Sequence, residues 1–338
     1  MYDVIIIGLA LLVLRPVKAL AQGHLAYSNE AGVEVERASW MGGIGDERLL
    51  SSLSLPGTHD SASNGPGGIL VRNQRKSIRD QLLSGIRFLD IRARLYQGDF
   101  AIHHDLVYLN KNFADVLRET TEFLKQYPSE TVYMRVKQEY SKESDDEFAN
   151  RFERYLEELA DYGLIYMASN RNPRLGDTRG KLVFLRDFKG SSYGLNYADF
   201  EIQDRYQLRS IWDMYKHKWL PIKGQLIRAD EDRQQRQFIN YLSGSGGVFP
   251  YFVASGHMFP KTDGRRLLMG LTTLKCQIYP DFPRVRLVLG LSAIVFEGTN
   301  TLTQNYIMIQ GLQHVGIVVA DFPGPGLIEA IITRNYDN

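Results

Sequence analysis

The chain lacks sequence features that are typical of disulfide-rich, nucleic-acid-binding and zinc-binding proteins. Its 338 residues include one cysteine, Cys276, so no disulfide can form within the chain, and a single thiol is compatible with either redox compartment. The net charge is +1, without the basic surplus that nucleic-acid binding requires, and we therefore expect no nucleic-acid partner. The sequence also contains no HExxH motif and no paired CxxC motif, which are common zinc-binding arrangements.

Long apolar runs are also scarce. Residues 4–14 are apolar apart from one glycine, but a membrane span needs roughly 20 apolar residues. The Ala-Leu-Ala at 19–21 fits the small-residue rule for signal-peptide cleavage. We expect residues 1–21 to be a signal peptide and the protein to be secreted, although Asp3 stands where a basic residue is usual. An amphipathic or mis-started N-terminus is the alternative.

Strand-like and helix-like segments alternate along the rest of the chain. The patterns predict strands at 49–55, 87–96, 100–104, 131–137, 181–188 and 314–321, and a buried strand or helix at 287–296. They predict helices at 77–85, 113–127, 145–159, 230–237 and 327–333. This alternation is typical of a mostly parallel sheet with outer helices. Because no internal repeat or low-complexity linker interrupts it, residues 22–338 are predicted to form one domain.

Two histidines stand out because each lies in a distinctive local sequence. His59 and Asp60 follow Leu-Pro-Gly-Thr, and His104 ends Ala-Ile-His-His. A strand that runs into Pro-Gly-Thr leaves His59 at its carboxyl end, where α/β barrels carry their catalytic residues. Arg92 lies on a predicted strand between the two histidines. Two imidazoles and one guanidinium can provide a base, an acid and a fixed cation for attack at a phosphodiester.

Several segments in the same order resemble the X region of the bacterial phosphatidylinositol-specific phospholipases C. They are LPGTHDS, FLDIRARL, IHHD, FLKQYPSETVYMRVKQEY, LGDTRGKLVFL, IQDRY and VGIVVADF. The resemblance is strongest across residues 49–140. It implies an irregular, incompletely closed (β/α) barrel, in agreement with the alternation of strands and helices. We therefore expect an α/β fold with a single TIM-like barrel of this kind.

The resemblance also implies roles for the two histidines. His59 resembles the general base that takes the proton from the inositol 2-hydroxyl, and His104 resembles the general acid that protonates the departing diacylglycerol oxygen. The products would be diacylglycerol and inositol 1,2-cyclic phosphate. Asp321 resembles the carboxylate that orients the base, and Asp60 resembles the partner of the acid. His103 is expected to face away from the site.

Further positions resemble groups that bind the substrate headgroup. Arg92 matches the phosphate-contacting arginine, and Asp90, two residues earlier on the same strand face, could hold its guanidinium. Lys137 matches a lysine that lines the headgroup pocket. Asp204 and Tyr206 resemble a carboxylate that binds inositol hydroxyls and an aromatic ring on which inositol stacks. These last three residues could instead satisfy contacts inside the barrel.

The sequence departs from the family at one substrate-binding position. Where the family commonly carries an arginine that contacts inositol, this chain has Asp187, with Arg186 one residue before it. A shift of one residue along a strand turns a side chain to the opposite face of the sheet. Either a local bulge brings Arg186 into the site, or headgroup recognition differs in this chain.

Arg92 bears on the question of cofactors. The calcium-dependent relatives bind Ca²⁺ with acidic or amide side chains in this region, and a cation at position 92 would repel a metal and replace its charge. We therefore expect a metal-independent enzyme without a cofactor.

The resemblance implies phosphatidylinositol in membranes as the partner, with glycosyl-phosphatidylinositol anchors as further candidate substrates. We expect peripheral membrane contact and a monomer. The candidates for this contact are Ile69-Leu70-Val71 and an aromatic cluster within 249–259, which could equally pack in the barrel wall. Two other functions stay open, a metal-dependent glycerophosphodiester-type phosphodiesterase and a non-catalytic lipid-binding barrel.

Overall fold

The computed structural model describes most of the chain. It covers residues 25–65, 68, 72–104, 107–160, 162–167, 170–232, 236–259, 268–271, 284–288 and 291–336, with the backbone alone at 104, 107, 268–271, 284–288 and 291–295. The predicted signal peptide, the Ile69-Leu70-Val71 segment and Cys276 lie outside the described residues.

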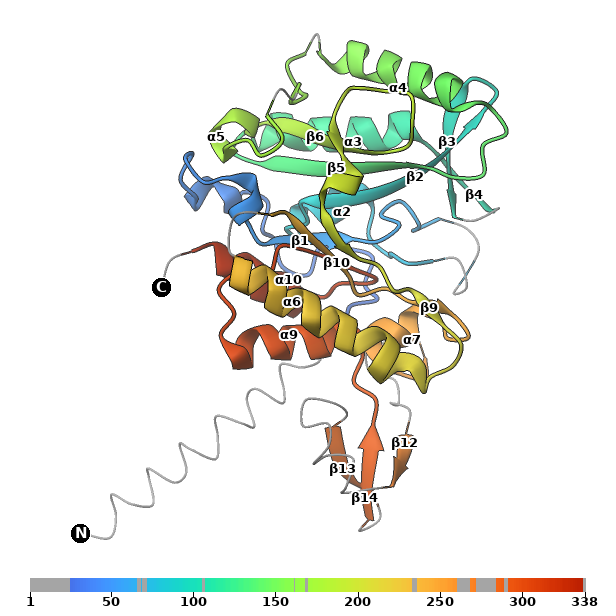
Figure 1. Cartoon of the computed structure of the whole chain (residues 1–338), viewed down its shortest axis with the longest axis vertical. Coiled ribbons are helices and arrows are strands. Elements are labelled where there is room, and N and C mark those ends of the chain that lie inside the picture. The colour runs from blue at the N-terminus through green and yellow to red at the C-terminus, as the bar shows by residue number, and fades with distance from the viewer. Residues whose placement is uncertain are drawn as a thin grey trace, which may run out of the picture.

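A curled sheet of parallel strands forms the centre of the molecule (Figure 1). Its neighbouring strands, in order, are β7 (Leu195–Asn196), β6 (Lys181–Asp187), β5 (Thr131–Gln138), β2 (Phe88–Tyr96), β1 (Leu55–Thr58), β15 (Ile317–Ala320), β10 (Phe238–Tyr241) and β8 (Glu201–Gln203). Every neighbouring pair along this path is parallel. Among the described residues no pairing joins β7 to β8, so the barrel is incompletely closed, and the predicted fold class is confirmed.

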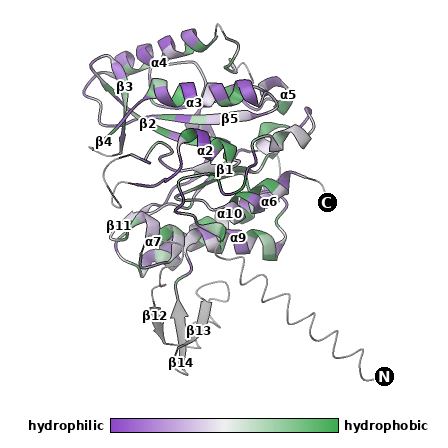
Figure 2. Cartoon of the chain, turned by 180° about the vertical axis from the view of Figure 1, so that it is seen from behind, coloured by the Kyte–Doolittle hydropathy of each residue, from purple (hydrophilic) through white to green (hydrophobic). Residues whose placement is uncertain are grey.

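Helices surround the sheet on its outer side. They are α2 (Ile78–Leu83), α3 (Phe113–Gln126), α4 (Asp145–Ala160), α5 (Leu175–Thr178), α6 (Leu220–Asp232), α7 (Pro250–Ser255), α9 (Thr299–Gln310) and α10 (Pro325–Ile332). In Figure 1, α3 and α4 lie above the strands and α6, α9 and α10 below them. Figure 2 shows hydrophilic and hydrophobic residues alternating along α3 and α4, as expected of helices with one buried face.

The local sequence explains how α3 begins and ends. Asn112 and Asp115 form a capping box at its start, which satisfies backbone N–H groups that have no partner inside the helix. Its buried side chains recur at helical spacing, from Phe113 through Val116 and Leu117 to Phe123 and Leu124. The helix ends before Pro128, as the sequence predicts.

Shorter strands extend the barrel. β2 pairs antiparallel with β3 (Asp99–His104), which pairs with β4 (Val107–Asn112). β9 (Gln207–Leu208) pairs with β11 (Ser245–Gly246). β12 (Leu268–Leu271), β14 (Leu291–Val295) and β13 (Arg284–Val288) form a third sheet, which extends below α7 and α9 in Figure 1. The run 287–296 thus contains a strand, which is one of the two predicted alternatives. Most of its side chains lie outside the described residues, so its predicted burial stays a prediction.

Two predicted elements are wrong. The strand predicted at 49–55 begins only at Leu55, because Leu50–Ser52 form a 3₁₀ turn, in which the Leu53 N–H donates to the Leu50 carbonyl. Strand pairing starts at Leu55, where β15 runs alongside. Of the helix predicted at 230–237, residues 230–232 form the last turn of α6, which starts at Leu220 and ends at Asp232, and 236–237 are not helical. Its start was missed because a π-helix, Met214–Trp219, leads into it.

Candidate active site

His59 lies at the carboxyl end of β1, directly after Thr58. β1 and β15 are parallel, with Thr58 opposite Ala320, so the next residues along the two strands, His59 and Asp321, face each other. The Nδ1 atom of His59 is 2.8 Å from the Asp321 Oδ1 atom. Only 1% of the Asp321 side chain is exposed, and 13% of the His59 side chain. The predicted orienting carboxylate therefore contacts the candidate base.

The two ring nitrogens of His59 have different partners. Asp321 can only accept a hydrogen bond, so Nδ1 carries the proton and donates it. The Nε2 atom is 2.6 Å from the Arg92 Nη2 atom, and because a guanidinium only donates, Nε2 accepts. Burial and the charge of Arg92 lower the pKa of His59, but the charge and hydrogen bond of Asp321 outweigh them, and the pKa is raised. Nε2 is therefore the basic atom directed at the cation.

Carboxylates hold Arg92 from three directions. Its Nε atom is 2.8 Å from Asp60 Oδ1, its Nη2 atom 3.5 Å from Asp90 Oδ2, and its Nη1 atom 3.3 Å from Glu139 Oε1. Burial lowers the pKa of the guanidinium, but the three carboxylates raise it overall, so Arg92 keeps its charge. Asp60 reaches Nε because its backbone has a φ of 44°, a left-handed conformation that aspartate tolerates better than most residues.

A second arginine lies deeper in the barrel, on the strand next to Arg92. The Nη1 atom of Arg135 is 3.0 Å from Asp90 Oδ1 and 2.9 Å from the Tyr241 hydroxyl, and its Nη2 atom is 2.5 Å from Asp187 Oδ2. The guanidinium also lies over the Tyr197 ring, 4.1 Å from its centre. Asp90 thus bridges Arg135 and Arg92, which fixes the orientation of both cations.

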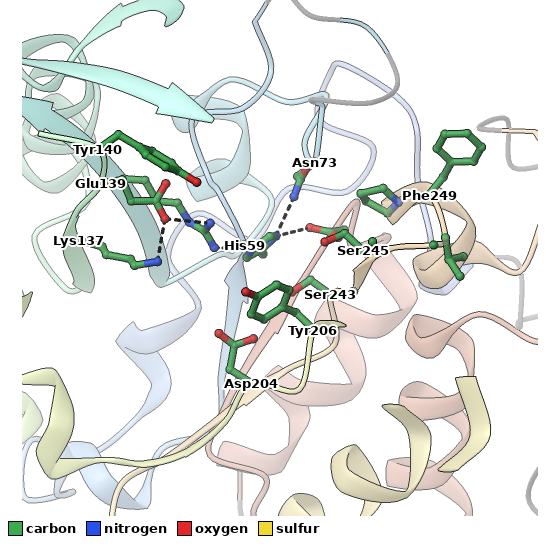
Figure 3. A pocket seen from close by; sticks show the side chains of 17 residues that line it. His59, Asn73, Lys137, Glu139, Tyr140, Asp204, Tyr206, Ser243, Ser245 and Phe249 are labelled. Carbon is green, nitrogen blue, oxygen red and sulfur yellow. Dashed lines mark hydrogen bonds and ion pairs between the residues drawn. The ribbon is translucent and has the colours of Figure 1, made fainter. Parts of the chain in front are cut away.

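These side chains border a cavity of about 530 Å³ at the carboxyl ends of the strands. Figure 3 shows Lys137 and Glu139 on one side of His59, with Asp204 and Tyr206 on another. The Lys137 Nζ atom is 2.7 Å from Glu139 Oε1, so this carboxylate contacts both Lys137 and Arg92. The cavity is lined by His59, Asn73, Arg92, Lys137, Glu139, Tyr140, Asp204, Tyr206, residues 243–250 and Asp321.

The structure brings most of the predicted site residues together. His59, Arg92, Lys137, Asp204, Tyr206 and Asp321 line the cavity, and Asp60 and Asp90 lie behind Arg92. His104 is the last residue of β3, where its backbone pairs with Val107. Its side chain lies outside the description, so the predicted pairing of Asp60 with His104 stays a prediction.

Arg186 is the predicted site residue that does not reach the cavity. β5 and β6 pair without a register shift, with Val136 opposite Arg186 and Lys137 opposite Asp187. No bulge turns Arg186 inward, and side chains alternate along a strand, so Arg186 faces away from Lys137. Asp187 faces inward instead and pairs with Arg135. Of the two alternatives, the register therefore excludes the bulge that would bring Arg186 into the site and leaves the one in which headgroup recognition differs.

The aromatic cluster at 249–259 contains both exposed side chains, as expected for membrane contact, and buried ones, as expected for packing in the barrel wall. Phe249, Met258 and Phe259 are 45%, 46% and 58% exposed, and Phe249 lines the cavity. Tyr251 and Phe252 are buried and pack in the wall of the molecule. Within this cluster, Phe249, Met258 and Phe259 therefore provide the exposed apolar surface, and Phe249 provides it at the cavity.

Sequence reasoning missed several residues that position the site. The Asn73 side-chain amide lies 2.8 Å from the Nδ1 atom of His59. The Gln74 amide donates to the backbone carbonyls of His59 and Ala320, so it ties the ends of β1 and β15 together. Both residues lie in the polar segment before α2, and nothing in their local sequence indicates this role. The position of Arg135 could have indicated its place in the site, because a charged residue two positions before Lys137 lies on the same face of the strand.

Two features are absent from the described residues. No group of three or more His, Cys, Asp or Glu side chains within them is arranged to hold a metal ion. No helix among them is long and apolar enough to cross a membrane.

Comparisons with known proteins agree with the fold and identify the family. The family model for the X domain of phosphatidylinositol-specific phospholipase C matches residues 55–187. A 1-phosphatidylinositol phosphodiesterase from Listeria monocytogenes is 31% identical over 237 residues, which are 64% of this chain and 71% of the relative. One from Staphylococcus aureus (strain Newman) is 28% identical over 256 residues, 66% of this chain and 80% of the relative.

Solved structures share the fold at lower identity. The phosphatidylinositol-specific phospholipase C from Listeria monocytogenes superposes with a TM-score of 0.64 at 23% identity, covering 90% of this chain and 100% of the other. A Staphylococcus aureus structure gives a TM-score of 0.66 at 23% identity, covering 89% of this chain and 98% of the other. The chain belongs to the family of phosphatidylinositol-specific phospholipases C that carry the X domain.

Proposed function

We propose that this chain cleaves phosphatidylinositol to diacylglycerol and inositol 1,2-cyclic phosphate. Its curated relatives are named 1-phosphatidylinositol phosphodiesterase, which supports the substrate class. The observation that carries the proposal is the 2.6 Å approach of Arg92 Nη2 to the Nε2 atom of a histidine whose Nδ1 contacts a buried carboxylate. This arrangement supports a role for His59 as a base beside the cation that would bind the phosphate.

In the proposed reaction the inositol 2-hydroxyl attacks the adjacent phosphorus. Its proton passes to Nε2 of His59, the new bond joins the 2-oxygen to phosphorus, and the bond from phosphorus to the diacylglycerol oxygen breaks. His104 supplies the proton that this oxygen gains. Because the nucleophile belongs to the substrate, it is already positioned for attack, which removes much of the entropic barrier. Asp321 stabilises the imidazolium that forms on His59.

Arg92 takes the role of phosphate ligand. Asp60 pairs with the Nε atom, so Nη1 and Nη2 would be the donors to two phosphate oxygens. Without substrate, Nη2 donates to His59 Nε2, and in the proposed complex the phosphate and the 2-hydroxyl would replace this contact. Glu139 contacts Nη1 at 3.3 Å, so the incoming phosphate takes its place or shares the donor. The fixed charge of the guanidinium offsets the charge that develops on the phosphoryl oxygens, and we propose that the reaction needs no metal.

Residues on the far sides of the cavity would bind the headgroup. Lys137, at the end of β5, would donate to inositol hydroxyls. Asp204 and Tyr206 follow the end of β8 and would accept from hydroxyls and stack on the ring. Lys137 pairs with Glu139 on the same side of the cavity. This ion pair would limit how the inositol ring can rotate in the site.

The same proposal covers location and partners. The exposed Phe249, Met258 and Phe259 would enter the headgroup layer of the membrane, in line with the Staphylococcus aureus enzyme, whose solved structures concern the modulation of its membrane binding. Glycosyl-phosphatidylinositol anchors are a second substrate class, because cyclisation needs only a free 2-hydroxyl. We propose that the protein acts as a secreted monomer, with residues 1–21 as its signal peptide.

The test measures release of diacylglycerol from phosphatidylinositol vesicles by the full chain, His59→Ala and His104→Ala. Each substitution should lower turnover roughly 10²- to 10⁴-fold, the usual contribution of a general acid or base. Near-normal turnover in either variant would contradict the assignment of that histidine.

His217→Ala is the matched control. This histidine is 55% exposed and pairs with Asp213 away from the cavity lining, so its loss should leave turnover unchanged. Circular dichroism of all three variants should match the parent chain, which separates loss of chemistry from loss of fold.

A further inference from the structure

A second pocket, of about 550 Å³, lies on the antiparallel extension of the barrel. It is lined by Arg94, Tyr96, Gln97, Asp99, Ala101, His103, Tyr108 and Asn112, none of which lines the catalytic cavity. The strand pairing explains why these side chains gather. Arg94 lies opposite Ala101, and His103 lies opposite Tyr108, so alternate residues of β2, β3 and β4 share one face. Figure 1 shows these three strands side by side.

The pocket continues the strand face that carries the catalytic cation. Arg94 follows Arg92 by two residues on β2, which places it on the same face about 7 Å further along the strand. His103, which is expected from the sequence to face away from the site, lies on this face too, as part of the pocket lining and not of the catalytic cavity. A molecule bound here would therefore lie next to the catalytic cavity.

His103 has an unmet hydrogen-bonding capacity in this pocket. Only 7% of the residue is exposed, and its buried Nδ1 atom has no hydrogen-bond partner among the described residues. Leaving a buried polar atom unpaired is costly, and native proteins rarely do so without a reason. An acceptor inside the pocket would satisfy this nitrogen once it carries a proton.

Arg94 provides a cation that the described carboxylates do not neutralise. Its one described interaction is with the Tyr96 ring, whose centre lies 5.8 Å from the guanidinium carbon. Asp99 is the acidic side chain among the lining residues, and it is engaged by Arg151 at 3.1 Å and by the Tyr155 hydroxyl. The positive charge in the pocket is thus available to a ligand.

We propose that this pocket binds a phosphate group, with Arg94 and His103 as its donors and the Tyr96 and Tyr108 rings as its walls. The guanidinium can hold two phosphate oxygens, and the His103 Nδ1–H can donate to a third. The phosphate could belong to a membrane lipid beside the substrate or to a soluble phosphate compound. This proposal does not rest on the proposed reaction.

A quaternary ammonium group fits the pocket less well. Two tyrosines can form part of a cage for such a cation. Here, however, the space over Tyr96 is taken by Arg94, which would repel a second positive charge. The ring of Tyr108 lies against His103, with 5.6 Å between their centres. The occupant favoured by these contacts is an anion.

The charged groups that face His103 determine the direction in which its pKa should change. They come from Arg94 on β2 and Asp99 on β3, with the hydroxyls of Tyr96 and Tyr108 as the other titratable groups. Burial and the charge of Arg94 lower the pKa of His103. A bound phosphate would offset that charge and favour the protonated ring, so it should raise the pKa.

The experiment follows the His103 ring protons by NMR as the pH is varied, with and without inorganic phosphate. The spectrum of His103→Gln identifies the signal. We expect phosphate to raise the apparent pKa of His103, and Arg94→Gln to weaken phosphate binding about tenfold, as expected when one charged hydrogen-bond donor is lost. Without phosphate, Arg94→Gln should itself raise the pKa, because the neighbouring cation is gone.

Two controls and a second probe complete the test. Arg118→Gln removes an exposed arginine on α3 and should leave the response unchanged. His59→Ala should also keep it, which separates this site from the catalytic cavity. A response to phosphatidylglycerol vesicles but not to inorganic phosphate would support a lipid source for the phosphate. No response to either probe, a response that survives Arg94→Gln, or a response to choline chloride would overturn the proposal.

Discussion

The pairing of His59 with Asp321 sets both the proton position and the pH at which the base can act. The Asp321 carboxylate raises the pKa of His59 and holds the proton on Nδ1, so Nε2 is the accepting atom, which would exchange its hydrogen bond from Arg92 for the proton of the substrate. The acidic limb of the activity profile should therefore lie above the pH expected of an ordinary histidine.

Asp321→Asn tests this pairing. The amide removes the charge that raises the pKa, so the acidic limb of kcat/KM should shift to lower pH. Turnover should fall by roughly 10²-fold or more, because the tautomer and ring orientation are no longer fixed. The measurement is a pH profile of both proteins on the same substrate. An unshifted limb would mean that a group other than His59 titrates in the profile.

Arg92→Lys tests the fixed cation. An ammonium keeps the charge but cannot contact Asp60 and two phosphate oxygens in one plane, so kcat should fall about 10²-fold or more. Steady-state kinetics on phosphatidylinositol vesicles measure the effect. Retention of near-normal kcat would show that the phosphate is bound by another group.

At the scale of elements, patterns that repeat along a strand could be read from the sequence, whereas isolated contacts could not. The strands β2, β5 and β6 were predicted within two residues of their ends. In β2 and β5 an apolar start is followed by charged residues at alternate positions, and β6 is an apolar run with charged residues at both ends. The 3₁₀ turn at Leu50–Ser52 was missed because its short apolar and serine sequence also fits a strand.

The register of β5 and β6 gives a prediction about Asp187. Asp187→Arg would place a cation against Arg135 and break its 2.5 Å ion pair, so we expect a less stable protein. A loss of about 1–3 kcal/mol would lower the thermal midpoint by several degrees. Asp199→Arg, at a more exposed ion pair with Arg171, is the control and should change the midpoint little. An unchanged midpoint in Asp187→Arg would contradict the inward position of Asp187.

The exposed apolar residues of the 249–259 cluster should govern binding to membranes. Replacing both Met258 and Phe259 by Ser should weaken affinity for phosphatidylinositol vesicles at least about tenfold, because each apolar side chain gains roughly 1–3 kcal/mol on full burial. Sedimentation with vesicles measures this affinity. Ile309→Ser is the control, because this exposed residue of α9 precedes β15 at the end of the barrel away from the cavity. Equal affinity in the parent and the double variant would exclude these residues from the contact.

At the scale of the whole molecule, the barrel brings together residues that are far apart in sequence. His59 and Asp321 are separated by 262 positions and His59 and Arg92 by 33, yet both pairs are in contact. The motifs around these residues allowed their roles to be predicted from resemblance. The contacts themselves depend on strand order and register, which local sequence patterns do not specify. This explains why the role of Gln74 was not foreseen and why the choice between Arg186 and Asp187 stayed open.

The most direct test of the central claim follows phosphatidylinositol vesicles with the full chain in EDTA by phosphorus NMR. We predict a resonance of five-membered inositol 1,2-cyclic phosphate that grows while the substrate resonance declines. Such a product requires attack by the substrate's own hydroxyl, with the Arg92 guanidinium in place of a metal. A product formed only after Ca²⁺ is added, or an acyclic inositol phosphate that appears without a cyclic precursor, would contradict this account.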